Sequence, residues 1–205
     1  MNTYDGFSKT ASSRLFLAVW LTVGLVACSN DNTQVTQVPI EVSRYGSTEI
    51  DIDLVIENSR ADVGKALSGA YLTSMSVVAP CEDLAAFRGE INLDFAQVRQ
   101  GLLGERIIVA RATIDTQHQS LTFAVQDETD QNLGRKPLVV KTQDVKTIAG
   151  SVVTYLKSTQ GCRGTIVLAR VGPDIPWRVR CGPPDKVFIE CLEIDPNTGQ
   201  IKKLP

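Results

Sequence analysis

Four cysteines in the second part of the chain carry the clearest chemistry: Cys81, Cys162, Cys181 and Cys191. An even number is typical of two disulfide bonds in an oxidising compartment, and four cysteines allow three pairings. All three pairings are open from the sequence. We favour Cys181 with Cys191 and Cys81 with Cys162, because the first pair encloses a short Gly-Pro-Pro loop. A tight turn over 182–185 would put Cys191 opposite residue 176, so this pairing requires a wide loop.

The same four cysteines could instead form a zinc site or a redox site. Their sequence separations are 81, 19 and 10, which include no C-x₂-C knuckle, and no histidine is near them. The missing C-x-x-C motif also removes the usual means of lowering a thiol pKa. We therefore expect structural disulfides, no metal and no cofactor.

Other side chains make a weak case for catalysis. The single histidine, His118, stands between two glutamines in a predicted turn. Ser151 lacks the second glycine of a G-x-S-x-G nucleophile motif. Carboxylate pairs at 51/53 and 90/94 are explained by the solvated face of a strand or helix. The sequence favours a protein without enzymatic activity, and leaves open an enzyme or enzyme inhibitor with an unrecognised site.

Arg178 and Arg180 form a candidate anion-binding pair. In "WRVRC" they alternate with Trp177, Val179 and Cys181, so both guanidinium groups project from one strand face. Two arginines can bind a carboxylate or phosphate in bidentate fashion. The alternative is that both side chains simply face solvent.

A fifth cysteine, Cys28, follows a short apolar run near the N-terminus. The stretch from Leu15 to Ala27 has 13 residues, whereas a spanning helix needs about 20. Lys9 and Arg14 precede it, as in a secretory signal peptide. Leu25-Val26-Ala27-Cys28 resembles the lipobox of bacterial lipoproteins, a resemblance that covers residues 1–28.

The resemblance implies a processing route. Residues 1–27 are a signal peptide, and Cys28 becomes the acylated first residue, bound to membrane lipid. Two or more acyl chains anchor stably where one binds only marginally. Ser29, in place of Asp, implies sorting to the outer membrane, with the domain in the periplasm. Residues 28–46 are then the lipidated cysteine and a flexible tether, and residues 47–205 are a single disulfide-braced domain.

Charge and length limit what the processed chain can do. Removing residues 1–27 leaves 178 residues, enough for one well-buried domain. The removed part holds two of the 21 basic and one of the 23 acidic residues, so the net charge becomes −3. A nucleic-acid binder needs a concentrated basic surface, which this sequence lacks.

Most of the domain is predicted to form strands. Alternating aliphatic and acidic residues at 49–56 predict a half-buried strand, and 106–115 with 120–127 predict a hairpin. Residues 135–141, 164–171 and 177–181 are predicted as further strands. Residues 191–204 predict a terminal hairpin that turns on Asp-Pro-Asn-Thr-Gly.

Two segments stay ambiguous between helix and strand. Residues 84–102 fit a helix, or a short helix followed by a strand, and residues 144–158 fit one helix face as well as a strand. The expected class is therefore β-rich, all-β or α+β: an antiparallel sandwich or bent sheet with one or two packed helices.

Three functions remain open. The first is a non-enzymatic accessory domain that binds another envelope protein, with sheet edges as one physical route. The second is a binding module for an anionic small ligand or cell-wall polymer at Arg178 and Arg180. The third is a periplasmic enzyme or enzyme inhibitor.

Overall fold

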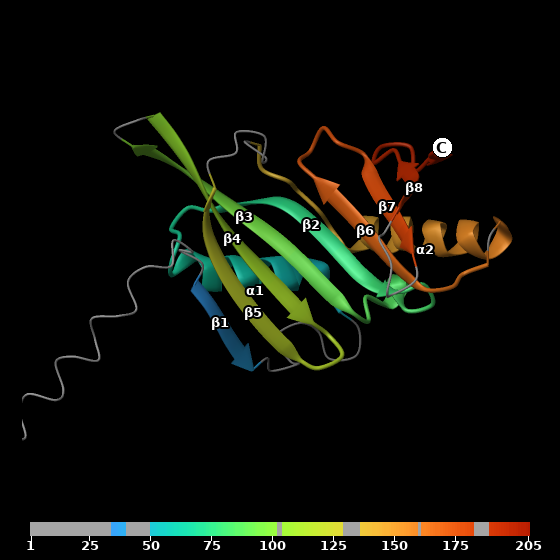
Figure 1. Ribbon diagram of the computed structural model, residues 1–205, viewed down its shortest axis with the longest axis horizontal. Helices are drawn as coiled ribbons and strands as arrows, with labels where there is room; N and C mark the ends of the chain where they lie inside the picture. Colours follow the sequence, from blue (N-terminus) through green and yellow to red (C-terminus); the bar gives the residue numbers. More distant parts are fainter. Residues whose placement is uncertain (1–33, 40–49, 102–103, 129–135, 160, 183–188) are drawn as a thin grey trace, which may run out of the picture. The chain divides into compact units, whose positions relative to one another are not determined.

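The computed structural model describes residues 34–39, 50–101, 104–128, 136–159, 161–182 and 189–205. Within them the chain forms one antiparallel sheet of nine strands, in the order β1-β5-β4-β3-β2-β6-β7-β8-β9 (Figure 1). β1 and β9 are its edges, so the sheet is open. The predicted β-rich class is confirmed as a single sheet with two packed helices, and a sandwich of two sheets is not formed.

The elements follow the sequence in a simple order. They are β1 (Gln34–Pro39), α1 (Ile52–Gly64), β2 (Tyr71–Pro80), η2 (Leu84–Ala86), β3 (Glu90–Gly101), β4 (Gly104–Asp115), β5 (Ser120–Glu128), α2 (Thr142–Thr159), β6 (Thr165–Val171), β7 (Trp177–Gly182), β8 (Ile189–Ile194) and β9 (Ile201–Lys203).

Two halves of the chain have the same topology. Helix α1 precedes strands β2 to β5, and helix α2 precedes strands β6 to β9. In each half the strands are added outward from the centre, where β2 pairs with β6. Apart from β1, which is added beyond β5, the strand order is therefore symmetric about the β2–β6 pair, although the sequence shows no repeat.

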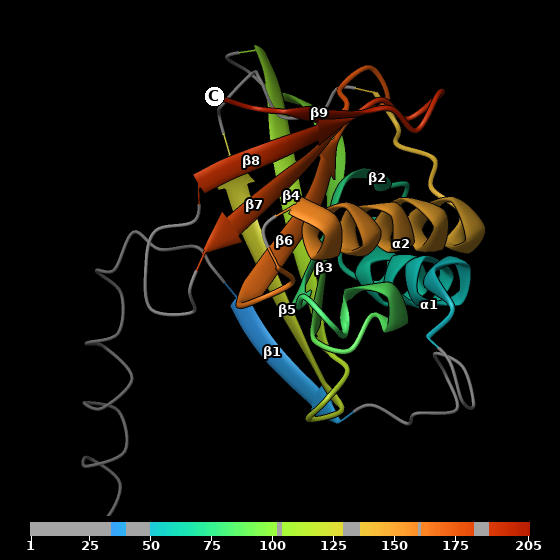
Figure 2. The same ribbon diagram turned by 90° about the vertical axis from the view of Figure 1, so that its right-hand side faces the viewer.

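Both helices cover the same face of the sheet (Figure 2). One continuous hydrophobic core joins them to the strands, with Phe95, Val77 and Trp177 among its fully buried members. Each helix contributes residues at helical spacing: Ile52, Val55, Ile56, Ser59 and Val63 from α1, and Val145, Ile148, Ala149, Val152, Val153 and Leu156 from α2. The opposite face of the sheet carries neither helix.

The strand predicted for residues 49–56 is wrong, because helix α1 begins there. The Asp51 carboxylate accepts hydrogen bonds from the backbone N–H groups of Asp53 and Leu54 at 3.0 and 3.3 Å, and so caps the helix. The polar residue between Ile50 and Ile52 is thus the helix cap and not the solvent-facing position of a strand. The helical spacing becomes visible only when the pattern is followed as far as Val63.

The strand predicted for residues 135–141 is also wrong over its described part. Residues 137–141 form no strand, although Leu138 and Val140 are buried and Val139 is 75% exposed. Leu138 N–H donates one hydrogen bond to the Leu72 carbonyl at 2.7 Å. Pro137 has no N–H to offer, so this extended segment packs on the sheet without joining its ladder.

The two ambiguous segments are resolved differently. Residues 84–102 contain the short helix η2 and then β3, whereas residues 144–158 lie in helix α2. Phe87 adopts a left-handed conformation after η2, with φ of 55°. Gly89 follows, and a Cβ there would lie 2.2 Å from the Val78 carbonyl oxygen. The close approach to β2 therefore requires glycine where β3 begins.

Both predicted hairpins are present. Strands β4 and β5 pair from Asp115↔Ser120 onward. The Asp115 carboxylate accepts hydrogen bonds from the N–H groups of Gln117 and His118, which closes the turn. At the C-terminal hairpin, Asp195 plays the same part between β8 and β9.

The expected tether contains an edge strand. Residues Gln34–Pro39 form β1, which pairs with β5 from Gln34↔Val125 to Pro39↔Ser120. Gln34–Pro39 therefore belong to the sheet, although the sequence placed them in the expected tether of residues 28–46. The signal peptide and Cys28 lie outside the described residues.

Two disulfides have the pairing that the sequence favoured. Cys81 at the end of β2 is bonded to Cys162 after α2, with a Cα–Cα distance of 5.5 Å. Cys181 in β7 is bonded to Cys191 in β8 at a Cα–Cα distance of 5.9 Å. The required wide connection is present, because β7 ends at Gly182 and β8 begins at Ile189. The register also shifts at Arg180, where Cys191 forms a bulge.

Candidate functional site

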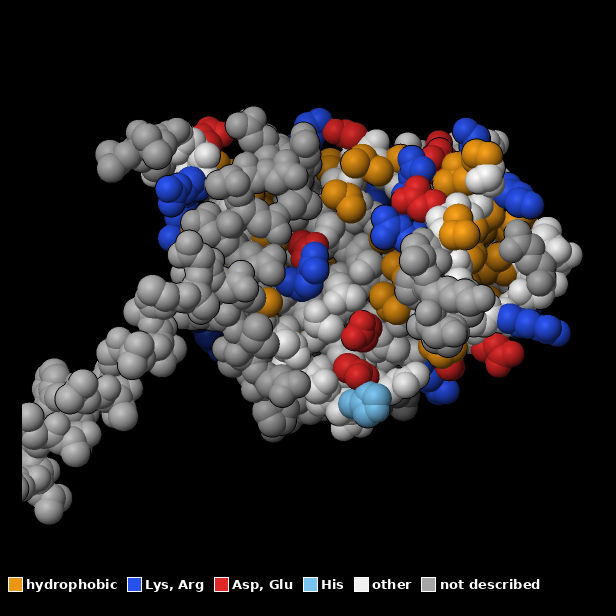
Figure 3. Space-filling model, in the orientation of Figure 1, with side chains coloured by type: hydrophobic (Ala, Val, Ile, Leu, Met, Phe, Trp, Pro, Cys, Tyr) orange, Lys and Arg blue, Asp and Glu red, His pale blue; other side chains and the backbone are white. Residues whose placement is uncertain are grey.

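The face of the sheet opposite the helices carries polar side chains across its middle and a small buried apolar cluster of Ala96, Ile107 and Val109 beside them. Because side chains alternate along a strand, the neighbours of the core residues point away from the helices. We define the uncovered face by these residues: Ser74, Ser76, Asn92, Asp94, Arg111, Thr113, Thr122, Arg178 and Arg180. Between the parts drawn in grey, Figure 3 shows polar and charged side chains and backbone with hydrophobic side chains among them.

Strand pairing arranges these small polar groups in a row across the sheet. Thr122, Thr113, Asn92 and Ser76 are directly opposite one another on four successive strands. Neighbouring strands are spaced by about 4.8 Å, so the row presents hydrogen-bonding groups at regular intervals. Thr113 donates a 2.7 Å hydrogen bond to the Asn92 side chain, which holds the pair in place. The row continues through Ala169 in β6 to Arg178 in β7.

A buried carboxylate lies near the middle of the face. Asp94 is only 8% exposed. Its two oxygens accept bonds from Nε and Nη2 of Arg111 at 2.7 and 3.1 Å, and the Ser74 hydroxyl donates at 2.6 Å. The Arg111 side chain remains 58% exposed. The Arg111 guanidinium group is thus held at the surface in a fixed orientation by the buried Asp94 carboxylate, which balances its charge.

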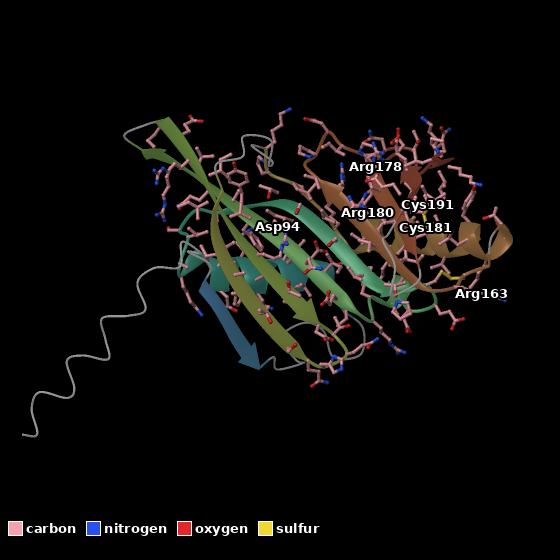
Figure 4. All side chains as sticks on the ribbon, viewed as in Figure 1. Asp94, Arg163, Arg178, Arg180, Cys181 and Cys191 are labelled. Atoms are coloured by element: carbon pink, nitrogen blue, oxygen red, sulfur yellow. A yellow bond between two sulfur atoms is a disulfide. The ribbon has the colours of Figure 1, made fainter. Side chains whose placement is uncertain are left out.

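Arg178 and Arg180 lie on one side of β7, as the alternation predicted (Figure 4). They are not an isolated cationic pair. Arg178 contacts Glu193 at 2.9 Å and Glu190 at 3.3 Å, and Arg180 contacts Glu190 at 3.3 Å. An external anion would have to compete with these carboxylates, which weakens the anion-binding interpretation.

His118 lies in the turn between β4 and β5, as predicted, and contacts one carboxylate. Its Nδ1 is 2.6 Å from Oδ2 of Asp115. Burial raises the pKa of Asp115, but the hydrogen bonds from His118 and Gln117 outweigh it and leave the pKa below its ordinary value. Asp115 is thereby held as an anion that stabilises the turn, which is a structural use of the pair.

Metal and membrane-spanning features are absent from the described part of the chain. No cluster of three or more His, Cys, Asp or Glu side chains there could hold a metal ion. None of the described helices has the length and apolar character needed to span a bilayer.

Comparison with known proteins leaves the function to be argued from this geometry. No protein-family model, curated protein or solved structure matches the chain. The uncovered face is therefore the candidate functional site, on its own evidence.

Sequence reasoning did not find the Asp94, Arg111 and Ser74 network. The signal lay in strand alternation, since Asn92 and Asp94 alternate with Ile91 and Leu93. It could not be used while residues 84–102 were ambiguous between helix and strand.

Proposed function

We propose that this protein is an outer-membrane lipoprotein without enzymatic activity, whose periplasmic domain binds another envelope protein through the uncovered face. The observation that carries the proposal is that face itself. A nine-stranded sheet braced by two disulfides has helices on one side and, on the other, a row of polar side chains beside a small apolar cluster. Such a broad, rigid surface suits a folded protein partner better than a small molecule.

The charges of the face favour a partner that supplies hydrogen bonds. Asp94 neutralises Arg111, and two glutamates neutralise Arg178 and Arg180. The arginines of the face are therefore balanced within it, and Glu90 and Asp115, which are directly opposite each other on the same face, add two carboxylates near the β4–β5 turn. Its exposed donors and acceptors are the hydroxyl, amide and guanidinium groups of the row and its neighbours, which match the polar part of a protein interface.

The face is a better route for binding than the sheet edge at β9. That edge strand is only three residues long and carries Lys202 and Lys203. Short strands and lysines protect edges against pairing with another chain. The anchoring part of the proposal is supported by the lipobox-like sequence from Leu25 to Cys28.

Site-specific photocrosslinking in intact cells tests the proposal. A photoreactive residue replaces Thr113 on the uncovered face or, as the control, Thr154 on the exposed side of α2. We expect a reproducible protein adduct from position 113 and none of the same mass from position 154. The same adduct from both positions, or no protein adduct from position 113, would contradict binding through this face.

A further inference from the structure

Three exposed aliphatic side chains lie at one end of the sheet, around the connection from β6 to β7. Among the described residues, the exposed large hydrophobic side chains are Val98, Val139, Val171, Ile175 and Ile189. We define the apolar patch by Val139, Val171 and Ile175, which are 75%, 36% and 44% exposed. Figure 3 shows hydrophobic side chains gathered over the end of β6 and this connection. Exposed apolar side chains that gather in one place are typical of interaction sites, whereas single ones are ordinary.

The two segments that carry the patch are joined to each other. Lys136 Nζ is 2.5 Å from Oδ2 of Asp174, so the chain that leads into α2 meets the β6–β7 connection. The Leu138 and Gly172 N–H groups donate to two consecutive carbonyls at the start of β2, at 2.7 and 2.8 Å. Each of these bonded residues is the chain neighbour of a patch residue, so both segments bring their aliphatic side chains to the start of β2.

The β6–β7 connection is held in a fixed shape. The guanidinium carbon of Arg170 lies 5.9 Å from the centre of the buried Trp177 ring. The same guanidinium group donates hydrogen bonds to the Pro173 and Ile175 carbonyls at 2.8 and 3.3 Å. A surface that is ordered in this way loses little conformational entropy when a partner binds.

The patch is continuous with the uncovered face. Val171 is directly opposite Ser74, whose hydroxyl donates to Asp94. Val139 points away from the helices, because both of its chain neighbours are buried in the core that the helices cover. The apolar patch therefore borders the network of Asp94 and Arg111 on the uncovered face.

The charges beside the patch favour a protein as the occupant. Lys136 contacts Asp174, and Arg178 of β7 contacts Glu193 and Glu190. An anionic lipid surface is recognised by clusters of basic residues, whereas these two cations are already paired with carboxylates. An apolar centre with a polar rim is the usual arrangement of a protein–protein interface. The patch and the polar row beside it have this arrangement.

We propose that the apolar patch is the anchor of the partner interface, which the envelope protein covers with uncharged apolar side chains. This inference rests on the proposed binding of an envelope protein through the uncovered face. It assigns to the patch the largest share of the affinity, since a few well-packed residues usually carry most of the binding energy of an interface. The polar row then surrounds the anchor and fixes the orientation of the partner through hydrogen bonds.

The yield of crosslinking from the uncovered face tests the anchor. The protein carries the photoreactive residue at position 113, and its adduct in intact cells is compared between the parent, Val139→Asp and Ile189→Asp. Ile189 is the matched control, because it is 70% exposed at the start of β8 and lies outside the patch. A carboxylate that is buried in an interface without a partner is costly. We expect Val139→Asp to lower the yield at least about tenfold, and Ile189→Asp and Val139→Leu to keep the yield of the parent.

A photoreactive residue at position 139 itself identifies what covers the patch. We expect a protein adduct of the same mass as the adduct from position 113. An adduct with lipid, or with a second copy of this chain, overturns the assignment of the patch.

The outcomes separate this inference from the proposed function. If the parent gives its adduct from position 113 and Val139→Asp gives the same yield, or both aspartate variants lose it equally, the anchor is overturned and the proposed function stands. No protein adduct from position 113 in the parent overturns both. Because Val139 is exposed, we expect each variant to keep the urea midpoint of the parent, followed by Trp177 fluorescence. If Val139→Asp lowers the midpoint, the adduct from position 139 decides instead.

Discussion

The two helices begin in contact with each other, and removing one hydroxyl group there should destabilise the whole domain. The Thr142 hydroxyl accepts a hydrogen bond from the Asp53 N–H at 2.9 Å and lies 2.8 Å from Oδ1 of Asp51. In return, the Thr142 N–H donates to the Asp53 carboxylate at 3.1 Å. The first turn of α1 and the first turn of α2 thus supply hydrogen-bond partners to each other, which links the two halves of the fold.

The expected cost of Thr142→Ala is about 1 kcal/mol of unfolding free energy. Loss of a capping hydroxyl costs about 0.5–2 kcal/mol, and the site is exposed, so water partly replaces the lost bonds. Thr142→Ser keeps the hydroxyl and should cost much less. The comparison isolates the hydroxyl, because the serine variant lacks only the methyl group.

Urea unfolding followed by tryptophan fluorescence measures this cost. Trp177 is 1% exposed and is the only tryptophan after residue 27, so its emission reports on the core of the disulfide-intact domain. The midpoint should fall in Thr142→Ala with an unchanged m-value. The reasoning is refuted if the alanine variant matches the parent, or if the serine variant falls equally far.

The hydrogen bond between Thr142 and Asp51 also predicts how the stability difference between the parent and Thr142→Ala depends on pH. The Thr142 hydroxyl is the largest influence that lowers the pKa of Asp51, followed by the Leu54 N–H. A carboxyl with a lowered pKa in the folded state stabilises the fold above its unfolded-state pKa, and this stabilisation is lost as the pH falls through the folded-state pKa. The difference between parent and Thr142→Ala should therefore shrink in acid. A difference that stays constant down to acid unfolding would count against the Asp51 contact.

Three further changes test the packing of the sheet. Gly89→Ala would place a methyl group against the backbone of β2 and should cost more than about 2 kcal/mol, measured by urea unfolding; wild-type stability would show that β3 does not pass so close. Arg111→Met leaves the buried Asp94 carboxylate without its main partner and should cost about 1.5–3 kcal/mol at neutral pH, again in urea. An additional Asp94→Asn change should recover part of that loss, and no recovery would argue that the cost arises elsewhere. Replacing the Cys81–Cys162 pair by alanines opens a sequence separation of 81 and should cost about 4.5 kcal/mol in the chain-entropy estimate. Thermal melts should show a larger loss than for the disulfide that closes a separation of 10, and the reverse order would contradict that account.

Local patterns predicted most strands because alternation and turn chemistry act over short distances. The β4–β5 and β8–β9 hairpins are examples, since Asp115 and Asp195 close their turns through their own backbone neighbours. The segment at 49–56 failed for the same reason: a window of eight residues contained the Asp51 cap but not the helical repeat that continues to Val63.

The candidate site was harder to predict because it depends on which strands are neighbours. The pair Arg178 and Arg180 was correctly placed on one strand face, but their partners come from β8, whose register follows from the bulge at Cys191. Similarly, Asp94 and Arg111 are 17 residues apart and meet only because β3 and β4 are paired in one register. Strand β1 lies in a polar stretch with no apolar period, so only its pairing with β5 reveals it.

The most direct test of the central claim is to block the uncovered face and measure capture of a partner from intact cells. The acylated protein is crosslinked at its native level, purified and analysed by mass spectrometry, as the parent, Thr113→Arg or Thr154→Arg. A large charged side chain at position 113 disrupts the row on the face, whereas position 154 lies on the helix side. We predict a stoichiometric envelope protein with the parent and with Thr154→Arg, and its loss with Thr113→Arg. Retention of this protein with Thr113→Arg, or its loss with Thr154→Arg, would contradict the account.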